Sequence, residues 1–139
     1  MKNLILLLLI IFQVFQTFAQ QQKHPIDVKN QKCLEEAVPT TIGSIICEKE
    51  ALKAWESEME TTLKLLKENE KLLDIKLLEE TQTKWLAFHK KQVQFYYSYY
   101  QIQYQGGTMA RAAALSHDKR YLRERVIYLK ELYEEISGQ

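Results

Sequence analysis

The sequence has little glycine, proline and cysteine and almost no net charge. Only 4 Gly, 2 Pro and 2 Cys occur among 139 residues. So few turn-forming residues argue against an all-β sandwich, and two cysteines exclude a densely cross-linked mini-protein. A formal net charge of +1 argues against a nucleic-acid-binding protein that relies on general basicity. The remaining balance, 46% hydrophobic and 27% charged residues, is typical of one globular, mostly helical domain.

The N-terminus has the pattern of a secretory signal peptide. A basic start is followed by an unbroken apolar run from Leu4 to Phe12, and small residues, Thr17 and Ala19, precede the predicted cleavage site. The run is shorter than the roughly 20 residues that span a bilayer, so an uncleaved anchor is the less favoured alternative. We therefore expect a signal peptide at 1–19 and a single helical domain at 20–139. The protein is then exported, periplasmic or secreted, with no stable membrane span after cleavage.

Cys33 and Cys47 are the only cysteines. An even count in an exported protein favours a disulfide, and two cysteines allow one pairing. The two cysteines are 14 residues apart. Closing a loop of about this length with a disulfide stabilises a fold by roughly 3 kcal/mol in the chain-entropy model. A redox or metal pair is the alternative, but no C-x-x-C motif occurs and the three histidines are scattered. We expect no metal and no cofactor.

Capping and turn residues predict the boundaries of four helices. A short helix runs over 27–37 with Asp27 as its N-cap, and Pro39 ends it. Ser44 begins the next helix, which reaches about Lys67. A longer helix covers 72–104 and ends at Gly106-Gly107, whose flexibility permits positive φ, and Thr108 caps a last helix over 109–136. The prediction is an all-α fold: a small antiparallel bundle of three long helices plus a short N-terminal helix stapled by one disulfide.

Each long helix carries an apolar stripe at three- and four-residue spacing, which predicts its buried face. The first stripe consists of Ile45, Leu52, Trp55, Met59, Leu63 and Leu66. The second consists of Leu78, Thr81, Trp85, Phe88, Gln92, Phe95, Tyr99 and Ile102. The third consists of Leu115, Leu122, Val126, Leu129, Leu132 and Ile136.

Charge is distributed unevenly along the chain. Residues 35–80 contain twelve acids and six bases, whereas 81–130 contain nine bases and two acids. The favoured interpretation is complementarity between helices inside the bundle. The alternative is an acidic flank, including Glu56 and Glu60, that steers a basic partner toward the protein.

The most distinctive local feature is a run of aromatic residues over 95–100, followed by Tyr104, near the end of the third predicted helix. Successive helical residues turn by about 100°, so these rings cannot all face one core. Phe95 and Tyr99 continue the stripe. The others flank it or lie off it, and they are candidate partner-binding residues: Tyr96, Tyr97, Tyr100 and Tyr104. The alternative is a tyrosine-rich rim whose rings cover the core.

No motif of a metalloprotease, serine hydrolase or nucleotide-binding loop occurs, and no motif supports glycoside hydrolysis by paired acids. We therefore do not expect an enzyme.

Four ordered sequence features resemble the family of small exported domains typified by the N-terminal domain of the lysozyme inhibitor LprI. They are the spaced pair Cys33 and Cys47; a following helix that contains Trp55; a Gln-x-x-Trp-x-x-Phe segment formed by Gln82, Trp85 and Phe88; and Gly106, Gly107 and Thr108 followed by Arg125 and Leu129. The resemblance covers about 26–136. It departs at His89-Lys90, where the family often has Arg then Asp, and at Glu60, where it has Asn. The family's second cysteine pair is missing at Gln92 and near Ser116.

The resemblance implies a binding module that blocks a lysozyme or related muramidase by occupying its substrate cleft. The alternative is a structural or interaction domain of the cell envelope with another exported protein as partner and no lysozyme inhibition. Neither interpretation involves nucleic acid, and the sequence leaves open a monomer or a dimer.

Export makes a measurable prediction. Cleavage after Ala19 leaves a chain that begins at Gln20. Intact-mass measurement of the protein recovered from the envelope or medium should show this species. A retained N-terminus would contradict the signal-peptide interpretation.

Overall fold

The computed structural model describes residues 23–138, and these residues fold into four α-helices without a strand. The helices are α2 (Pro25–Glu36), α3 (Thr41–Lys67), α4 (Ile75–Gln103) and α5 (Thr108–Ser137). The predicted all-α class is therefore confirmed. The predicted signal peptide lies outside the described residues. None of the four helices is long and apolar enough to cross a membrane.

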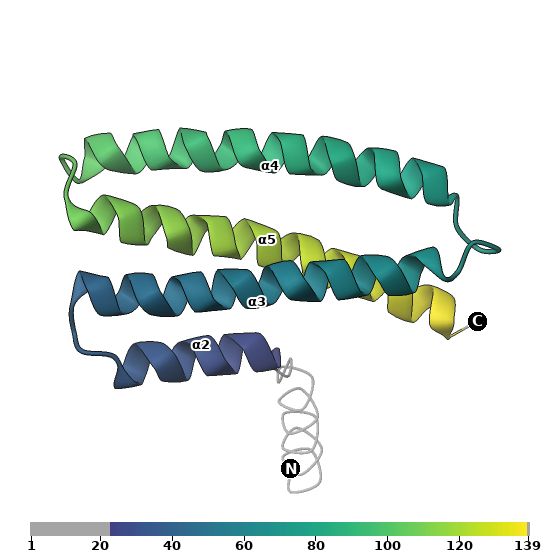
Figure 1. The fold of residues 1–139 in the computed structure, drawn as a ribbon, viewed down its shortest axis with the longest axis horizontal. Helices are drawn as coiled ribbons and strands as arrows, with labels where there is room; N and C mark the ends of the chain where they lie inside the picture. The colour runs from purple at the N-terminus through teal and green to yellow at the C-terminus, as the bar shows by residue number, and fades with distance from the viewer. Residues whose placement is uncertain (1–22, 139) are drawn as a thin grey trace, which may run out of the picture.

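The helices lie side by side in the order α2, α3, α5, α4, so α5 lies between α3 and α4 (Figure 1). Consecutive helices run antiparallel, and α3 and α5 consequently run in the same direction. The principal contact of α3 is with α5 rather than with its sequence neighbour α4. This order leaves α4 at one edge of the molecule, where α5 is its main packing partner.

The helix starts differ from the predicted positions: α4 begins at Ile75 rather than at 72 and α5 at Thr108 rather than at 109, and the caps of α2 and α3 also differ. α2 begins at Pro25 rather than Asp27 because proline at the first helical position has its φ already set. Its N-cap is His24, whose Nδ1 accepts a hydrogen bond from the backbone nitrogen of Ile26 at 3.3 Å. α3 is capped by Thr40 rather than Ser44: Thr40 Oγ1 accepts from the backbone nitrogen of Gly43 at 3.1 Å.

Gly43 is required by the close approach of two backbone segments at this turn. A Cβ at position 43 would lie 2.6 Å from the carbonyl oxygen of Val38. The short connection between α2 and α3 therefore depends on a residue without a side chain.

The other two connections use different capping groups. α4 begins after Asp74, which accepts from the backbone nitrogen of Leu77 at 3.0 Å. At its other end positive φ occurs at Gln105 and Gly106, but not at Gly107. Gly107 is the N-cap of α5 without a side-chain hydrogen bond, and Thr108 is the first helical residue rather than the predicted cap.

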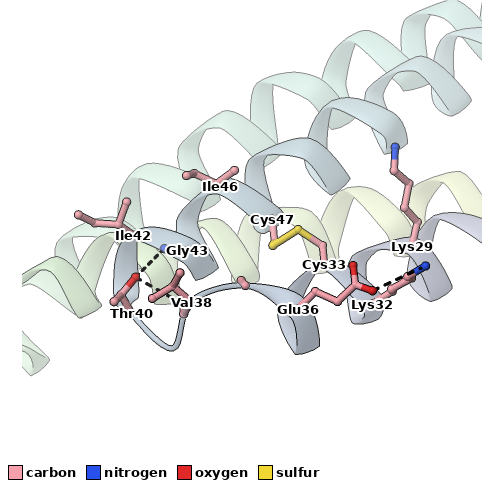
Figure 2. Close-up of a pocket in the computed structure, with 11 residues that line it drawn as sticks. Lys29, Lys32, Cys33, Glu36, Val38, Thr40, Ile42, Gly43, Ile46 and Cys47 are labelled. Atoms are coloured by element: carbon pink, nitrogen blue, oxygen red, sulfur yellow. Dashed lines mark hydrogen bonds and ion pairs between the residues drawn. A yellow bond between two sulfur atoms is a disulfide. The ribbon is translucent and has the colours of Figure 1, made fainter.

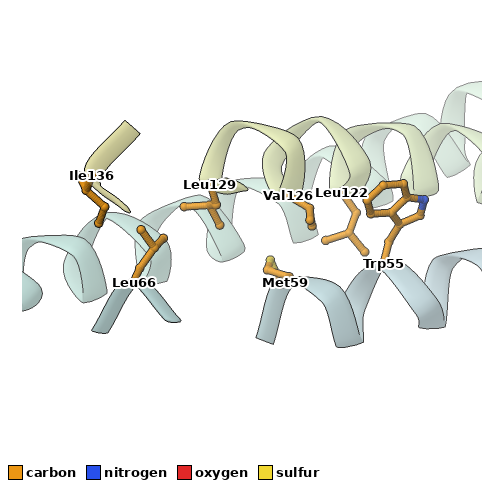
Figure 3. Close-up of a cluster of buried hydrophobic side chains, with 7 residues drawn as sticks. All are labelled: Trp55, Met59, Leu66, Leu122, Val126, Leu129 and Ile136. Atoms are coloured by element: carbon orange, nitrogen blue, oxygen red, sulfur yellow. The ribbon is translucent and has the colours of Figure 1, made fainter. Parts of the chain in front are cut away.

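The hydrophobic core lies between α3 and α5 (Figure 3). Its buried side chains come from the predicted stripes of these two helices: Trp55, Met59, Leu66, Leu122, Val126, Leu129 and Ile136. Leu52, Leu63 and Leu132 pack against this cluster as partly buried residues. The stripes of α3 and α5 are thus largely confirmed.

The stripe predicted for α4 is wrong along one side. Phe88, Phe95, Tyr99 and Ile102 are exposed rather than buried. α4 turns a different flank to α5, which includes the following residues: Gln82, Trp85, His89 and Tyr96. Because α4 lies at the edge, one neighbouring helix cannot cover a stripe that spans two adjacent flanks.

The predicted disulfide joins Cys33 of α2 to Cys47 of α3. Replacing both cysteines with alanine should lower the free energy of unfolding by roughly 3 kcal/mol, because the unfolded chain loses a closed loop. Chemical denaturation with and without reductant checks this. The wild type should lose stability in reductant while the double variant does not respond, and two titratable thiols in the unreduced wild type would contradict the pairing.

Candidate functional site

Three residues that carry the family resemblance meet at the contact between α4 and α5. Arg125 donates from Nε and Nη2 to Gln82 Oε1, at 3.1 and 3.0 Å. Its guanidinium lies 5.6 Å from the centroid of the Trp85 ring, and burial lowers the pKa of Arg125. Gln82 also donates to Met59 Sδ at 3.2 Å. These contacts join α4 to α5 and, through Met59, to α3.

The residue after this motif continues the same contact. The His89 ring stacks on Trp85 at 4.7 Å, and its Nε2 lies 2.9 Å from Asp118 Oδ1 of α5. Through this contact His89 joins α4 to α5. Phe88, by contrast, is exposed and takes no part in this contact.

A polar network buried between α2, α3 and α5 was not predicted. Lys119 Nζ lies 2.7 Å from Glu48 Oε2 and donates to Asn30 Oδ1 at 2.6 Å. Asn30 in turn donates to the carbonyl oxygen of Cys47 at 3.2 Å. Glu48 appeared in sequence only as an acid near the start of a helix, and nothing local signals its burial. The network orients the short helix α2 on the two long ones.

Further ion pairs join α5 to the other helices. Arg123 of α5 pairs with Asp27 of α2 at 2.7 Å, and Lys130 of α5 pairs with Glu58 of α3. The Lys119–Glu48 and Lys130–Glu58 pairs connect the basic segment 81–130 to the acidic segment 35–80 and support the prediction that the uneven charges complement each other inside the bundle. Among the described residues, Glu56 and Glu60 take part in none of the ion pairs.

Two of the four candidate tyrosines pack on a histidine of α5. The Tyr96 ring lies 3.5 Å from the centroid of the buried His117 ring, and Tyr100 Oη lies 3.3 Å from His117 Nδ1. Burial and the nearby charge of Arg120 lower the pKa of His117. Tyr121 also stacks on His117, with ring centroids 4.8 Å apart, and lies 6.1 Å from Tyr96. Tyr96 and Tyr100 are thus half-buried and cover part of the α4–α5 contact.

Tyr100 and Tyr104 line an open hollow of about 450 Å³ between α2, α4 and α5. Its other walls include Asp27, Arg120 and Arg123. Asp27 pairs with Arg123. Arg120 takes part in none of the ion pairs of the described residues, and its guanidinium lies 5.7 Å from the centroid of the Tyr121 ring. This surface is aromatic and weakly basic.

Tyr97 lies on a different face. It lines a hollow of about 290 Å³ between α3, α4 and α5, together with Lys49 of α3. Residues seven apart share a helix face, so Glu56 lies on the same side of α3 as Lys49, and Glu60 follows one turn later. The six candidate residues therefore divide into two surfaces: Tyr97 with Glu56 and Glu60, and Tyr100 with Tyr104 beside Tyr96.

A further hollow was not predicted from sequence. It has a volume of about 690 Å³ and lies beside the disulfide, at the connection between α2 and α3 (Figure 2). Its walls are mostly apolar, and they include the exposed side chains of Val38, Ile42 and Ile46. The Lys32–Glu36 ion pair lies at its rim.

Together these observations define a small helical protein whose candidate sites are open surfaces. In residues 23–138 no cluster of three His, Cys, Asp or Glu side chains could hold a metal ion. The chain matches the family described as "Lysozyme inhibitor LprI" over residues 33–129, and it belongs to this family. No curated protein and no solved structure matches the chain significantly.

The exposure of the tyrosines predicts unequal effects on stability. Tyr97→Ala and Tyr104→Ala should each change the free energy of unfolding by less than about 1 kcal/mol, as at most surface positions. Tyr96→Ala should cost clearly more, because its ring packs on His117. Urea denaturation measures all three. Equal losses at the three positions would make the exposed rings structural and remove them as binding candidates.

Proposed function

We propose that this protein inhibits a lysozyme or related muramidase by covering its substrate cleft, without chemistry of its own. The observation that carries the proposal is the family match over residues 33–129, which extends from the first cysteine to Leu129 in the core of α5. The matched segment contains the disulfide, the Gln82–Arg125 contact and all of the α3–α5 core except Ile136. These features make the scaffold rigid. Rigidity lowers the entropic cost of binding for an inhibitor that acts by covering a cleft.

The contact residues of this proposal are the exposed tyrosines on α4 and the acids of α3. Tyr97 and Tyr104 present large rings to solvent, and such rings contribute area at low entropic cost. Glu56 and Glu60 are exposed and absent from the ion pairs of the described bundle, so their charges are available for steering a basic partner. Glu48 and Glu58 of α3, by contrast, pair with Lys119 and Lys130 of α5.

Export is part of the same proposal. A cell-wall hydrolase acts outside the cytoplasm, and removal of residues 1–19 would place the inhibitor there. The disulfide Cys33–Cys47 supports an oxidising compartment, because such bonds persist outside the cytosol.

A titration of the oxidised protein into lysozymes of several classes tests the proposal. Lysis of cell walls should stop at a stoichiometric amount of protein for at least one class. Tyr97→Ala combined with Tyr104→Ala should weaken inhibition at least tenfold, because interface tyrosines often contribute more than 1.4 kcal/mol. Tyr128→Ala, which removes an exposed tyrosine of α5, is the matched control and should inhibit normally.

The same assay distinguishes the contribution of the acids from that of the tyrosines, and it shows which of the two surfaces contacts the lysozyme. Glu56→Gln with Glu60→Gln should slow association and reduce its salt dependence, while dissociation changes little. Single tyrosine variants show whether Tyr97 or Tyr104 lies on the contacting surface. If no lysozyme class is inhibited, the proposal is wrong, and the structural or interaction role in the cell envelope becomes the better hypothesis.

A further inference from the structure

An apolar strip on the outer side of α4 has no partner in the described structure. Its central residues stand seven apart: Thr81, Phe88, Phe95 and Ile102. Leu77 lies one turn before them and Tyr99 between the last two. The large side chains are well exposed, at 58% for Phe88, 64% for Phe95 and 79% for Ile102. Single exposed apolar residues are common, but an ordered row along five turns is not.

The spacing of the strip indicates what kind of surface covers it. Together with Leu78, Trp85 and Gln92 it forms a 3–4 repeat, the pattern of a helix that packs lengthwise against other helices. α5 covers only one half of this repeat, because it contacts Trp85 and its neighbours. The uncovered half keeps the seven-residue period, which suits a second helix better than a flat lipid surface.

The size of the strip is close to what a stable dimer needs. At roughly 200 Å² for a fully exposed large side chain, Leu77, Phe88, Phe95, Tyr99 and Ile102 together expose on the order of 600 Å². A standard interface buries about 800 Å² per partner. Polar residues beside the strip supply the remainder, and on α4 they include Lys84 and Lys91, which stand four residues before and three residues after Phe88.

We propose that a second copy of this chain covers the strip, so that the protein forms a two-fold dimer through α4. The same residues on both copies make such an interface self-complementary. α4 lies at the edge of the molecule, so a second α4 can approach without displacing another helix (Figure 1). Tyr97 lies two residues, or about 200°, from Phe95 around the helix. Its surface with Glu56 and Glu60 therefore stays open in the dimer, and this inference does not depend on the proposed function.

Sedimentation velocity of the oxidised protein, from low micromolar to near-millimolar concentration, tests the dimer. The wild type should change from monomer to dimer across this range. Phe95→Glu and Ile102→Glu should each remain monomeric at all concentrations, because they place a charge in the apolar strip. Ile42→Glu is the matched control: Ile42 is as exposed as Phe95, at 66%, but lies near the disulfide, and this variant should dimerise normally.

Circular dichroism shows that each variant is folded, and Ile102 is exposed enough that its replacement leaves the core untouched. A wild type that stays monomeric throughout overturns the proposal. So does a dimer that survives both α4 variants or is lost in Ile42→Glu. Binding of a monomeric wild type to phosphatidylglycerol vesicles, lost in Phe95→Glu, would instead assign the strip to a lipid surface and contradict the dimer.

Discussion

The packing of α3 against α5 is the interaction on which the rest of the structure depends. Trp55, which is fully buried, and its neighbours over residues 55–66 of α3 meet the stripe of α5 over residues 122–136. The other two helices attach to this pair from opposite sides: α2 packs on α3, and α4 packs on α5. Burial of large side chains of this kind contributes roughly 1.5–3 kcal/mol each, far more than any surface ion pair. The α3–α5 contact is therefore what positions every other surface.

Polar groups have a different role, which is to select one arrangement of the attached helices. Lys119 ties α2 and α3 to α5, and Arg125 with Gln82 ties α4 to α5. A buried lysine or arginine left without its partner would be costly, so alternative positions of α2 and α4 are disfavoured. Lys119–Glu48, together with Lys130–Glu58, also pairs part of the charge that is unevenly distributed in sequence. Glu56, Glu60 and the outward tyrosines keep their polar groups free for another molecule.

The family motif and the candidate binding residues occupy different parts of the fold. Gln82, Trp85 and Arg125 face inward and join helices, whereas Tyr97 and Tyr104 face solvent. A match to the motif thus reports the scaffold more directly than it reports the surface that contacts a partner. Members with the same scaffold can present different residues around it, which is how one fold supports several binding partners.

Sequence alone determined the helical class, the disulfide between Cys33 and Cys47, and the buried stripes of α3 and α5. These follow from local periodicity, turn residues and the pairing of two cysteines, all of which act over short distances. Only the tertiary structure decided which helices are neighbours. α5 lies between α3 and α4, so half of the α4 repeat is left exposed, and the candidate residues separate onto two faces. The physical reason is that a periodic apolar stripe predicts which face of a helix is buried. It does not specify which helix, of the same chain or of a second copy, packs against that face.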